Sequence, residues 1–98
     1  EEIMMRFKDL KFTPTNAPKG AQSVLHFGDY ELSIVNTGYG SDQGLYEIGC
    51  FQHGKFVELP GITETGDTVK GFLSEQEVDG IMIKMYTITG KNPTVGKS

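Results

Sequence analysis

The segment from Ser23 to Val35 places the strongest constraint on the fold. Two runs rich in β-branched and aromatic residues, Ser23 to Phe27 and Tyr30 to Val35, flank the dipeptide Gly28-Asp29. Because glycine readily adopts the positive φ of the primed two-residue turns, this pattern predicts a β-hairpin. Alternation turns His26 away from the buried face. The side chains expected to share that buried face are Leu25, Phe27, Tyr30, Leu32 and Ile34.

A long glycine-rich segment separates this hairpin from a second one. Residues 36–44 contain three glycines and follow neither the helical nor the strand period, so we expect a loop. The next two apolar runs, residues 45–51 and 56–59, predict strands joined by a turn over residues 52–55. Pro60-Gly61 is expected to end the sheet.

The N-terminal residues add a further strand to this prediction. In residues 5–12, Leu10 and Phe12 alternate with polar neighbours, as they would in a half-buried strand. Residues 13–20 contain two prolines and a glycine, which predicts a connection rather than a linker between domains. Residues 1–4 are a candidate extension ahead of the natural start.

The C-terminal third predicts one amphipathic helix. Ser74 and Glu77 have the spacing of a capping box, so the helix is expected to begin at Glu75. Its hydrophobic residues recur at i, i+3, i+4 and i+7, which places them on one face against the sheet. This stripe consists of Val78, Ile81, Met82 and Met85. Residues 63–73 are ambiguous, although their spacing favours a short helical turn, and residues 90–98 are expected to be a disordered tail.

These elements predict an α+β fold with a small, mainly antiparallel sheet of about five strands and one C-terminal helix packed on it. A chain of 98 residues has room for one hydrophobic core. We therefore expect a single domain over residues 5–89.

The charge distribution limits the classes of partner. The chain carries 9 basic and 13 acidic side chains, and the acids cluster between Glu64 and Asp79. A domain without a basic face lacks the phosphate contacts that nucleic-acid binding requires, so DNA and RNA are not expected partners. No apolar stretch approaches the roughly 20 residues of a membrane span, so a membrane is not expected either. The single cysteine forms no internal disulfide, which favours a reducing cytosol.

The residues that could carry nucleophilic or metal chemistry are Cys50, His26 and His53. Cys50 and His53 have the spacing of half a zinc site, but a tetrahedral site needs two further ligands and only His26 and a carboxylate remain. A cysteine–histidine nucleophile would need a nearby group that stabilises the thiolate. We therefore interpret Cys50 as a core residue and His53 as a turn residue. We predict no catalytic residue, no metal site and no cofactor.

Tyr39, which lies between two glycines, is the most informative residue of the predicted loop. An aromatic side chain on such a loop either packs inward or contacts a ligand, and the sequence leaves both alternatives open. Acidic residues follow at Asp42 and in the segment from Asp67 to Asp79. The side chains predicted to contact a partner are Tyr39, Ser41, Asp42, Asp67, Glu75 and Asp79.

Three segments of the chain carry a recognisable pattern. Residues 5–10 match the opening Met-Lys/Arg-Phe-x-Asp-Leu, and residues 39–41 form a Tyr-Gly-Ser loop. Residues 66–78 are similar to the pattern Thr-Asp-Asp-Val-x-Gly-x-Leu-Thr-Glu-Glu-Asp-Val. Together these segments resemble a family of small proteins encoded by tailed bacteriophages. The resemblance implies a phage origin and expression in the cytoplasm of the infected bacterial host.

The resemblance also implies a class of function, since many small phage proteins act by binding and disabling a host protein. We therefore expect a non-enzymatic accessory protein whose partner is a host protein and which inhibits a defence system or another host process. Two alternatives remain open. The chain could bind a small nucleotide-like ligand through glycine amides and Tyr39. It could instead be a minor structural protein of the virion, for which a homo-oligomer is expected.

Overall fold

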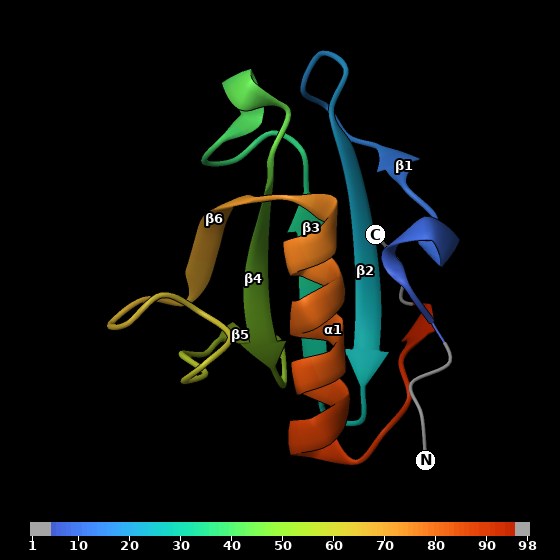
Figure 1. The fold of residues 1–98 in the computed structure, drawn as a ribbon, viewed down its shortest axis with the longest axis vertical. Helices are drawn as coiled ribbons and strands as arrows, with labels where there is room; N and C mark the ends of the chain where they lie inside the picture. Colours follow the sequence, from blue (N-terminus) through green and yellow to red (C-terminus); the bar gives the residue numbers. More distant parts are fainter. Residues whose placement is uncertain (1–4, 96–98) are drawn as a thin grey trace.

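Three long antiparallel strands form the centre of the sheet. In the computed structural model, which describes residues 5–95, they are β2 (Ala21–Phe27), β3 (Tyr30–Val35) and β4 (Tyr46–Gln52). The helix α1 (Glu75–Thr89) lies across one face of these strands (Figure 1). The predicted α+β class, with a mainly antiparallel sheet and one C-terminal helix, is confirmed.

Four shorter strands extend the sheet on both sides. β1 (Thr13–Pro14) and β7 (Thr94–Val95) pair with β2, whereas β5 (Lys55–Phe56) and β6 (Val69–Leu73) pair with β4. The sheet described for residues 5–95 therefore has seven strands, where the sequence predicted about five. The strand pairs in this range are antiparallel.

The hairpin formed by β2 and β3 has the predicted two-residue turn and the register that such a turn requires. Leu25 lies opposite Leu32, and Phe27 lies opposite Tyr30. Gly28 has a φ of 65°, the positive value that a primed turn needs. The turn residues therefore fix which side chains of the two strands enter the core.

α1 begins where the capping box predicts. The Glu77 amide donates to Ser74 Oγ at 3.2 Å, and the Ser74 amide donates to Glu77 Oε1 at 2.9 Å. At the other end, Gly90 has a left-handed φ of 69° and its amide donates to the Tyr86 carbonyl at 2.8 Å. Within residues 5–95, no helix has both the length and the apolar character needed to cross a membrane.

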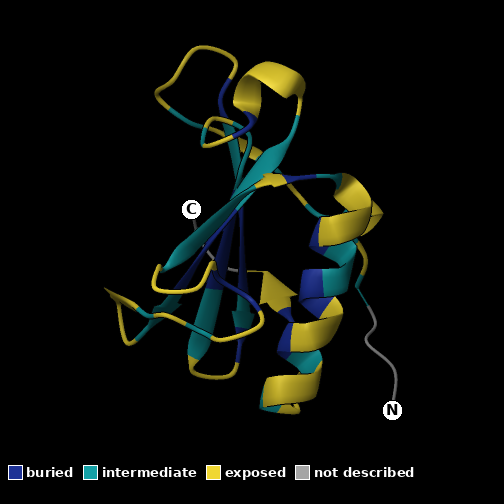
Figure 2. Ribbon diagram, turned by 60° about the vertical axis from the view of Figure 1, so that its left-hand side comes forward, coloured by how far each residue is buried: buried dark blue, intermediate teal, exposed yellow. Residues whose placement is uncertain are grey.

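The hydrophobic core lies between α1 and the sheet. Figure 2 shows the buried side of α1 turned toward the strands and its exposed side turned away. The predicted stripe of α1 and the predicted face of the first hairpin both contribute, although Tyr30 is only partly buried. The buried core consists of Leu25, Phe27, Leu32, Ile34, Ile48, Cys50, Ile62, Leu73, Val78, Ile81, Met82 and Met85.

The segment predicted as an N-terminal strand forms a 3-10 helix, η1 (Phe7–Asp9), so that prediction was wrong. The Phe7 amide donates to Asp79 Oδ1 on α1 at 2.6 Å. The rings of Phe7 and Phe12 pack against Tyr46 with centroid distances of 5.1 and 5.9 Å. These contacts give the Phe7 amide an acceptor on α1 and pack the two rings against β4 without strand pairing. The short apolar alternation of the segment therefore does not lead to a strand.

Val69 to Leu73 form the strand β6, where a short helical turn was expected within residues 63–73. Tyr46 of β4 lies opposite Leu73 of β6, and the register shifts at a β-bulge that contains Gly71 and Phe72. An extra residue in one strand interrupts the two-residue period, which produced the misleading helical spacing. The prediction that Pro60-Gly61 ends the sheet was also wrong, because β6 and β7 join the sheet further along the chain.

The prediction of a disordered tail is wrong for Thr94 and Val95, which form β7. Here β7 pairs with β2 opposite Leu25 and His26. An edge strand presents unpaired backbone groups, and even a polar segment can satisfy them. The candidate extension at residues 1–4 and the rest of the tail, residues 96–98, lie outside the described residues.

Candidate functional site

A groove opens where the loop that contains Tyr39 meets β6. It has a volume of about 370 Å³, and two exposed aromatic side chains, Tyr39 and Phe72, line it. Glu64, Asp67 and Lys70 also contribute to its lining. This feature, named here the Tyr39–Phe72 groove, therefore combines aromatic surface with charged groups.

Two glycines allow the backbone of the loop to lie directly against β6. A β-carbon added at Gly71 would lie 2.4 Å from Cβ of Tyr39. One added at Gly40 would lie 2.9 Å from Cα of Phe72. The Phe72 amide donates to the Tyr39 carbonyl at 2.9 Å, and the Leu45 amide donates to the Gly40 carbonyl at 3.0 Å. Backbone contacts therefore fix the position of the loop on the strand.

Phe72 has an unusual backbone conformation for a bulky residue. Its φ is 57°, in the left-handed region that glycine favours. Holding a residue with a β-carbon there costs about 1–2 kcal/mol. Burial offsets little of this cost, because Phe72 is 54% exposed. Strained residues of this kind cluster at functional sites, which makes Phe72 a candidate contact residue.

The structure excludes one of the two alternatives for Tyr39. The residue is 66% exposed, so it does not pack into the core. Ser41 and Asp42 follow it in the exposed 3-10 helix η2 (Ser41–Gln43). Asp67 approaches the same groove from the turn that precedes β6. Four of the predicted contact residues therefore lie in the groove or on the loop beside it.

The other two predicted contact residues do not line the groove. Asp79 accepts a hydrogen bond from the Phe7 amide, so its carboxylate is used within the fold. Glu75 lies at the start of α1, near Tyr46. Burial raises the pKa of the Tyr46 phenol, and the Glu75 carboxylate raises it further. Both acids therefore belong to the side of α1 that faces the N-terminal segment.

The Tyr39–Phe72 groove has an acidic rim. Asp67 Oδ1 accepts a hydrogen bond from the Thr68 amide at 2.6 Å, but neither Glu64 nor Asp67 forms an ion pair within residues 5–95. The pKa of Glu77 lies below its ordinary value, mainly because of hydrogen bonds at the helix N-cap and to a smaller extent because of Lys70. Lys70 therefore acts on a carboxylate of α1 as well as lining the groove, and within residues 5–95 neither groove acid has a basic side chain at ion-pair distance.

A second hollow adjoins the groove across Val69, which lines both features. This hollow has a volume of about 250 Å³ and lies over Gly49, on the face of the sheet opposite to α1. The rings of Phe51 and Phe56 stand beside it with their centroids 4.3 Å apart. Aromatic groups therefore continue from the groove onto the sheet. The four aromatic residues of this region, together with Val69, which lines both hollows, are named the aromatic surface: Tyr39, Phe51, Phe56, Val69 and Phe72.

Three residues that line the groove, Phe72, Val69 and Glu64, were not predicted from the sequence as site residues. The feature that could have found them is Gly71, because a glycine inside a strand often marks a bulge or a close backbone approach. The helical interpretation of this segment obscured that signal. Tyr39 was found because its signal, an aromatic residue between glycines, is local.

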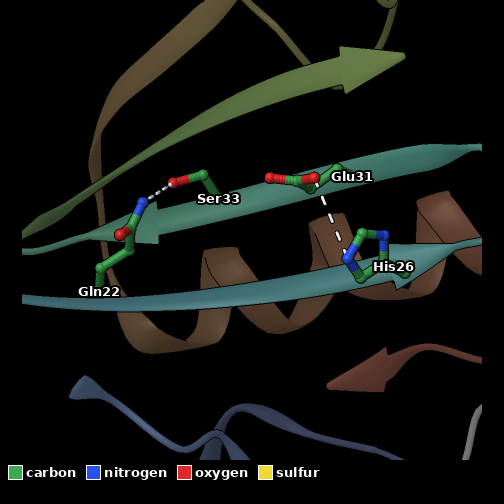
Figure 3. A network of polar contacts seen from close by, with 4 residues as sticks. All are labelled: Gln22, His26, Glu31 and Ser33. Carbon is green, nitrogen blue, oxygen red and sulfur yellow. Dashed lines mark hydrogen bonds and ion pairs between the residues drawn. The ribbon is translucent and has the colours of Figure 1, made fainter. Parts of the chain in front are cut away.

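A polar network occupies the sheet face away from α1 (Figure 3). His26 Nε2 and Glu31 Oε1 are 4.0 Å apart, and Gln22 Nε2 donates to Ser33 Oγ at 2.8 Å. His26 therefore points away from the core, as the alternation predicted.

Cys50 and His53 occupy the positions expected of a core residue and a turn residue. Cys50 is buried, and burial raises the pKa of its thiol to about 11, so the thiol stays protonated at neutral pH. His53 lies in the turn between β4 and β5 with a φ of 54°. Across the described range, no three His, Cys, Asp or Glu residues are grouped so that they could hold a metal ion.

No protein-family model matches the sequence, and comparisons with curated proteins and with solved structures find no match either. The Tyr39–Phe72 groove and the aromatic surface around it are therefore the structural features that bear on function.

Proposed function

We propose that this chain is a small non-enzymatic protein that binds another protein through the Tyr39–Phe72 groove. The resemblance to small phage proteins supports a bacterial host protein as the partner and the cytoplasm of the infected cell as the place of binding. Binding then disables a defence system or another host process. One observation carries the proposal: Phe72 is exposed and strained, and it lies beside a second exposed aromatic residue, Tyr39.

Rigid aromatic side chains are effective anchors at protein interfaces. They supply large contact areas with few rotatable bonds, so binding costs little side-chain entropy. Here the hydrogen bond from the Phe72 amide to the Tyr39 carbonyl fixes the two residues relative to each other. Val69 and Phe56 extend the contact area across the sheet. An aromatic centre with a charged rim is the usual composition of an interface hot spot.

The charges around the groove favour a protein over a nucleotide-like ligand. Phosphates need free amides or basic side chains, whereas the carboxylates of Glu64 and Asp67 repel them. Lys70 is the basic residue of the groove lining, and it also acts on Glu77. The alternative of a virion component differs in another respect, because it predicts self-association.

Affinity capture from a bacterial lysate, followed by native mass spectrometry, tests the proposal with matched variants. Tagged wild-type protein is compared with Tyr39→Ala and with the control Ile88→Ala. Ile88 is 50% exposed near the end of α1 and lines neither hollow of the aromatic surface. We expect a stoichiometric host protein with the wild type and the control, and at least about tenfold less with Tyr39→Ala.

Thermal unfolding of each variant verifies that Tyr39→Ala keeps the fold. Equal capture by all three proteins would contradict a role for the groove. A small bound mass that disappears on denaturation would favour the ligand alternative, and a homo-oligomer without a host protein would favour the virion component.

A further inference from the structure

We infer that the Tyr39–Phe72 groove receives an arginine side chain of the partner protein. This inference rests on the proposed function, because it specifies which residue the partner inserts. At about 370 Å³, the groove lies at the small end of the range for ligand pockets, which suits one long side chain. Its aromatic lining and its two carboxylates, which form no ion pair within the described residues, together select the chemistry of that side chain.

The aromatic lining favours a cation with a flat face. Tyr39 and Phe72 are 66% and 54% exposed, so both rings are accessible to a partner. Aromatic faces attract a guanidinium or ammonium group through the ring quadrupole, and guanidinium also stacks on them. A neutral aliphatic side chain would use the rings but leave the neighbouring carboxylates without a partner.

The carboxylates supply the charge complementarity. Glu64 and Asp67 both line the groove, and neither forms an ion pair within the described part of the chain. Glu58 brings a third carboxylate close to them, since its Oε2 accepts a hydrogen bond from the Gly66 amide at 2.8 Å. Lys70 faces Glu77 as well as the groove, because both residues line a separate hollow against α1. The lining itself holds two carboxylates, Glu64 and Asp67, against one ammonium group, Lys70, so its net charge is −1 and a single cation would neutralise it.

Arginine fits this combination better than lysine. Its planar guanidinium can lie against a ring while its N–H groups donate to carboxylate oxygens in a fixed, forked geometry. An ammonium group is a compact charge that keeps its hydration more strongly, so it gains less from an aromatic lining. Arginine is also enriched at the centres of protein interfaces, where aromatic residues surround it.

A titration followed by two-dimensional amide NMR tests the inference directly. The probes are N-acetyl-arginine amide, N-acetyl-lysine amide and N-acetyl-citrulline amide, of which the last has the shape of arginine without its charge. We expect saturable shifts at the amides of Tyr39, Gly71 and Phe72 with the arginine probe. The lysine probe is expected to bind more weakly, and the citrulline probe is expected to leave these signals unchanged.

Two variants and one matched control separate the aromatic and the electrostatic contributions. Phe72→Gly is expected to weaken binding of the arginine probe about threefold, the usual effect of one exposed cation–π contact. Glu64→Gln is expected to weaken it about two- to fivefold at low salt and less at high salt. Glu31→Gln removes the same charge on the polar sheet face beside His26, and it should leave binding unchanged. Amide spectra of each variant confirm that the fold is retained.

Three results would overturn the inference: equal shifts with the citrulline probe, equal or tighter binding of the lysine probe, or an arginine response that is absent or located elsewhere. If host-protein capture depends on Tyr39 while the arginine probe does not bind, the inference fails and the proposed function stands. If the arginine probe binds as expected but capture does not depend on Tyr39, the proposed function fails instead.

Discussion

Replacing Phe72 by glycine and by alanine separates the strain of its backbone from the packing of its ring. Because Phe72 is 54% exposed, each variant loses less than half of the roughly 1.5–3 kcal/mol that full burial of such a side chain contributes. Glycine alone also relieves the left-handed strain of about 1–2 kcal/mol. Glycine also loses more conformational entropy on folding than alanine, which cancels about 0.5–1 kcal/mol of the stability gained by relieving the strain. The midpoints of these two ranges differ by about 0.8 kcal/mol, so we expect the glycine variant to be more stable than the alanine variant by roughly that amount.

Urea unfolding at 25 °C, followed by circular dichroism, measures this difference. Ile83→Gly and Ile83→Ala form the control pair, since Ile83 is 40% exposed inside α1. In a helix, the glycine variant is expected to be less stable than the alanine variant by about 1 kcal/mol. The difference in free energy of unfolding between the glycine and alanine variants should therefore have opposite signs at positions 72 and 83. An alanine variant of Phe72 that equals or exceeds the glycine variant in stability would refute the positive φ and the bulge built on it.

Three further predictions concern the loop contact, the helix cap and the buried thiol. Gly71→Ala should lower the free energy of unfolding by about 1–3 kcal/mol, because the added Cβ would lie 2.4 Å from Cβ of Tyr39; a urea midpoint equal to that of the wild type would contradict this. The lowered pKa of Glu77 means that its carboxylate stabilises the fold above its ordinary value of 4.5, and that this contribution disappears as the pH falls through the folded value. The stability difference between wild type and Glu77→Gln, measured by urea unfolding, should therefore narrow between neutral pH and pH about 3, and a constant difference would count against the cap. The Cys50 thiol should react slowly with a disulfide reagent at neutral pH and quickly in urea, since it is buried with a pKa of about 11; fast labelling of the native protein would show that the site is open.

The elements that the sequence predicts well have signals confined to a few neighbouring residues. The first hairpin depends on Gly28 and on the alternation of the two runs beside it. The helix depends on Ser74 and Glu77, which satisfy each other's backbone amides. Such signals remain valid in almost any tertiary context, so the fold class follows from them.

The elements that the sequence does not predict depend on partners far along the chain. β6 forms because β4 offers an unpaired edge, and its bulge hides the strand period. β7 pairs with β2 although the segment is polar, and η1 forms where the Phe7 amide meets Asp79 of α1. In each case a tertiary contact overrides the local pattern.

The residues of the candidate site likewise divide into those with a local sequence signal and those that depend on distant contacts. Tyr39 could be predicted, because glycines on both sides of an aromatic residue are visible in the sequence. Phe72 could not, because its exposure depends on the contact between β6 and a loop from which it is separated along the chain by two strands, β4 and β5. Glu75 and Asp79 were grouped with Asp67 by proximity in sequence, but the turn into α1 directs them to another side of the molecule.

The hydrogen bonds along β6 also bear on how the protein avoids aggregation. The outer edge of a sheet is an open template for strands of other chains. Here the Glu64 amide donates to the Val69 carbonyl at 2.9 Å, and the Tyr39 carbonyl accepts from the Phe72 amide. The chain thereby covers its own edge at two points with irregular backbone. A partner that approaches from this side must displace those bonds to add a strand, so recognition through side chains is the easier route and self-templated assembly is discouraged.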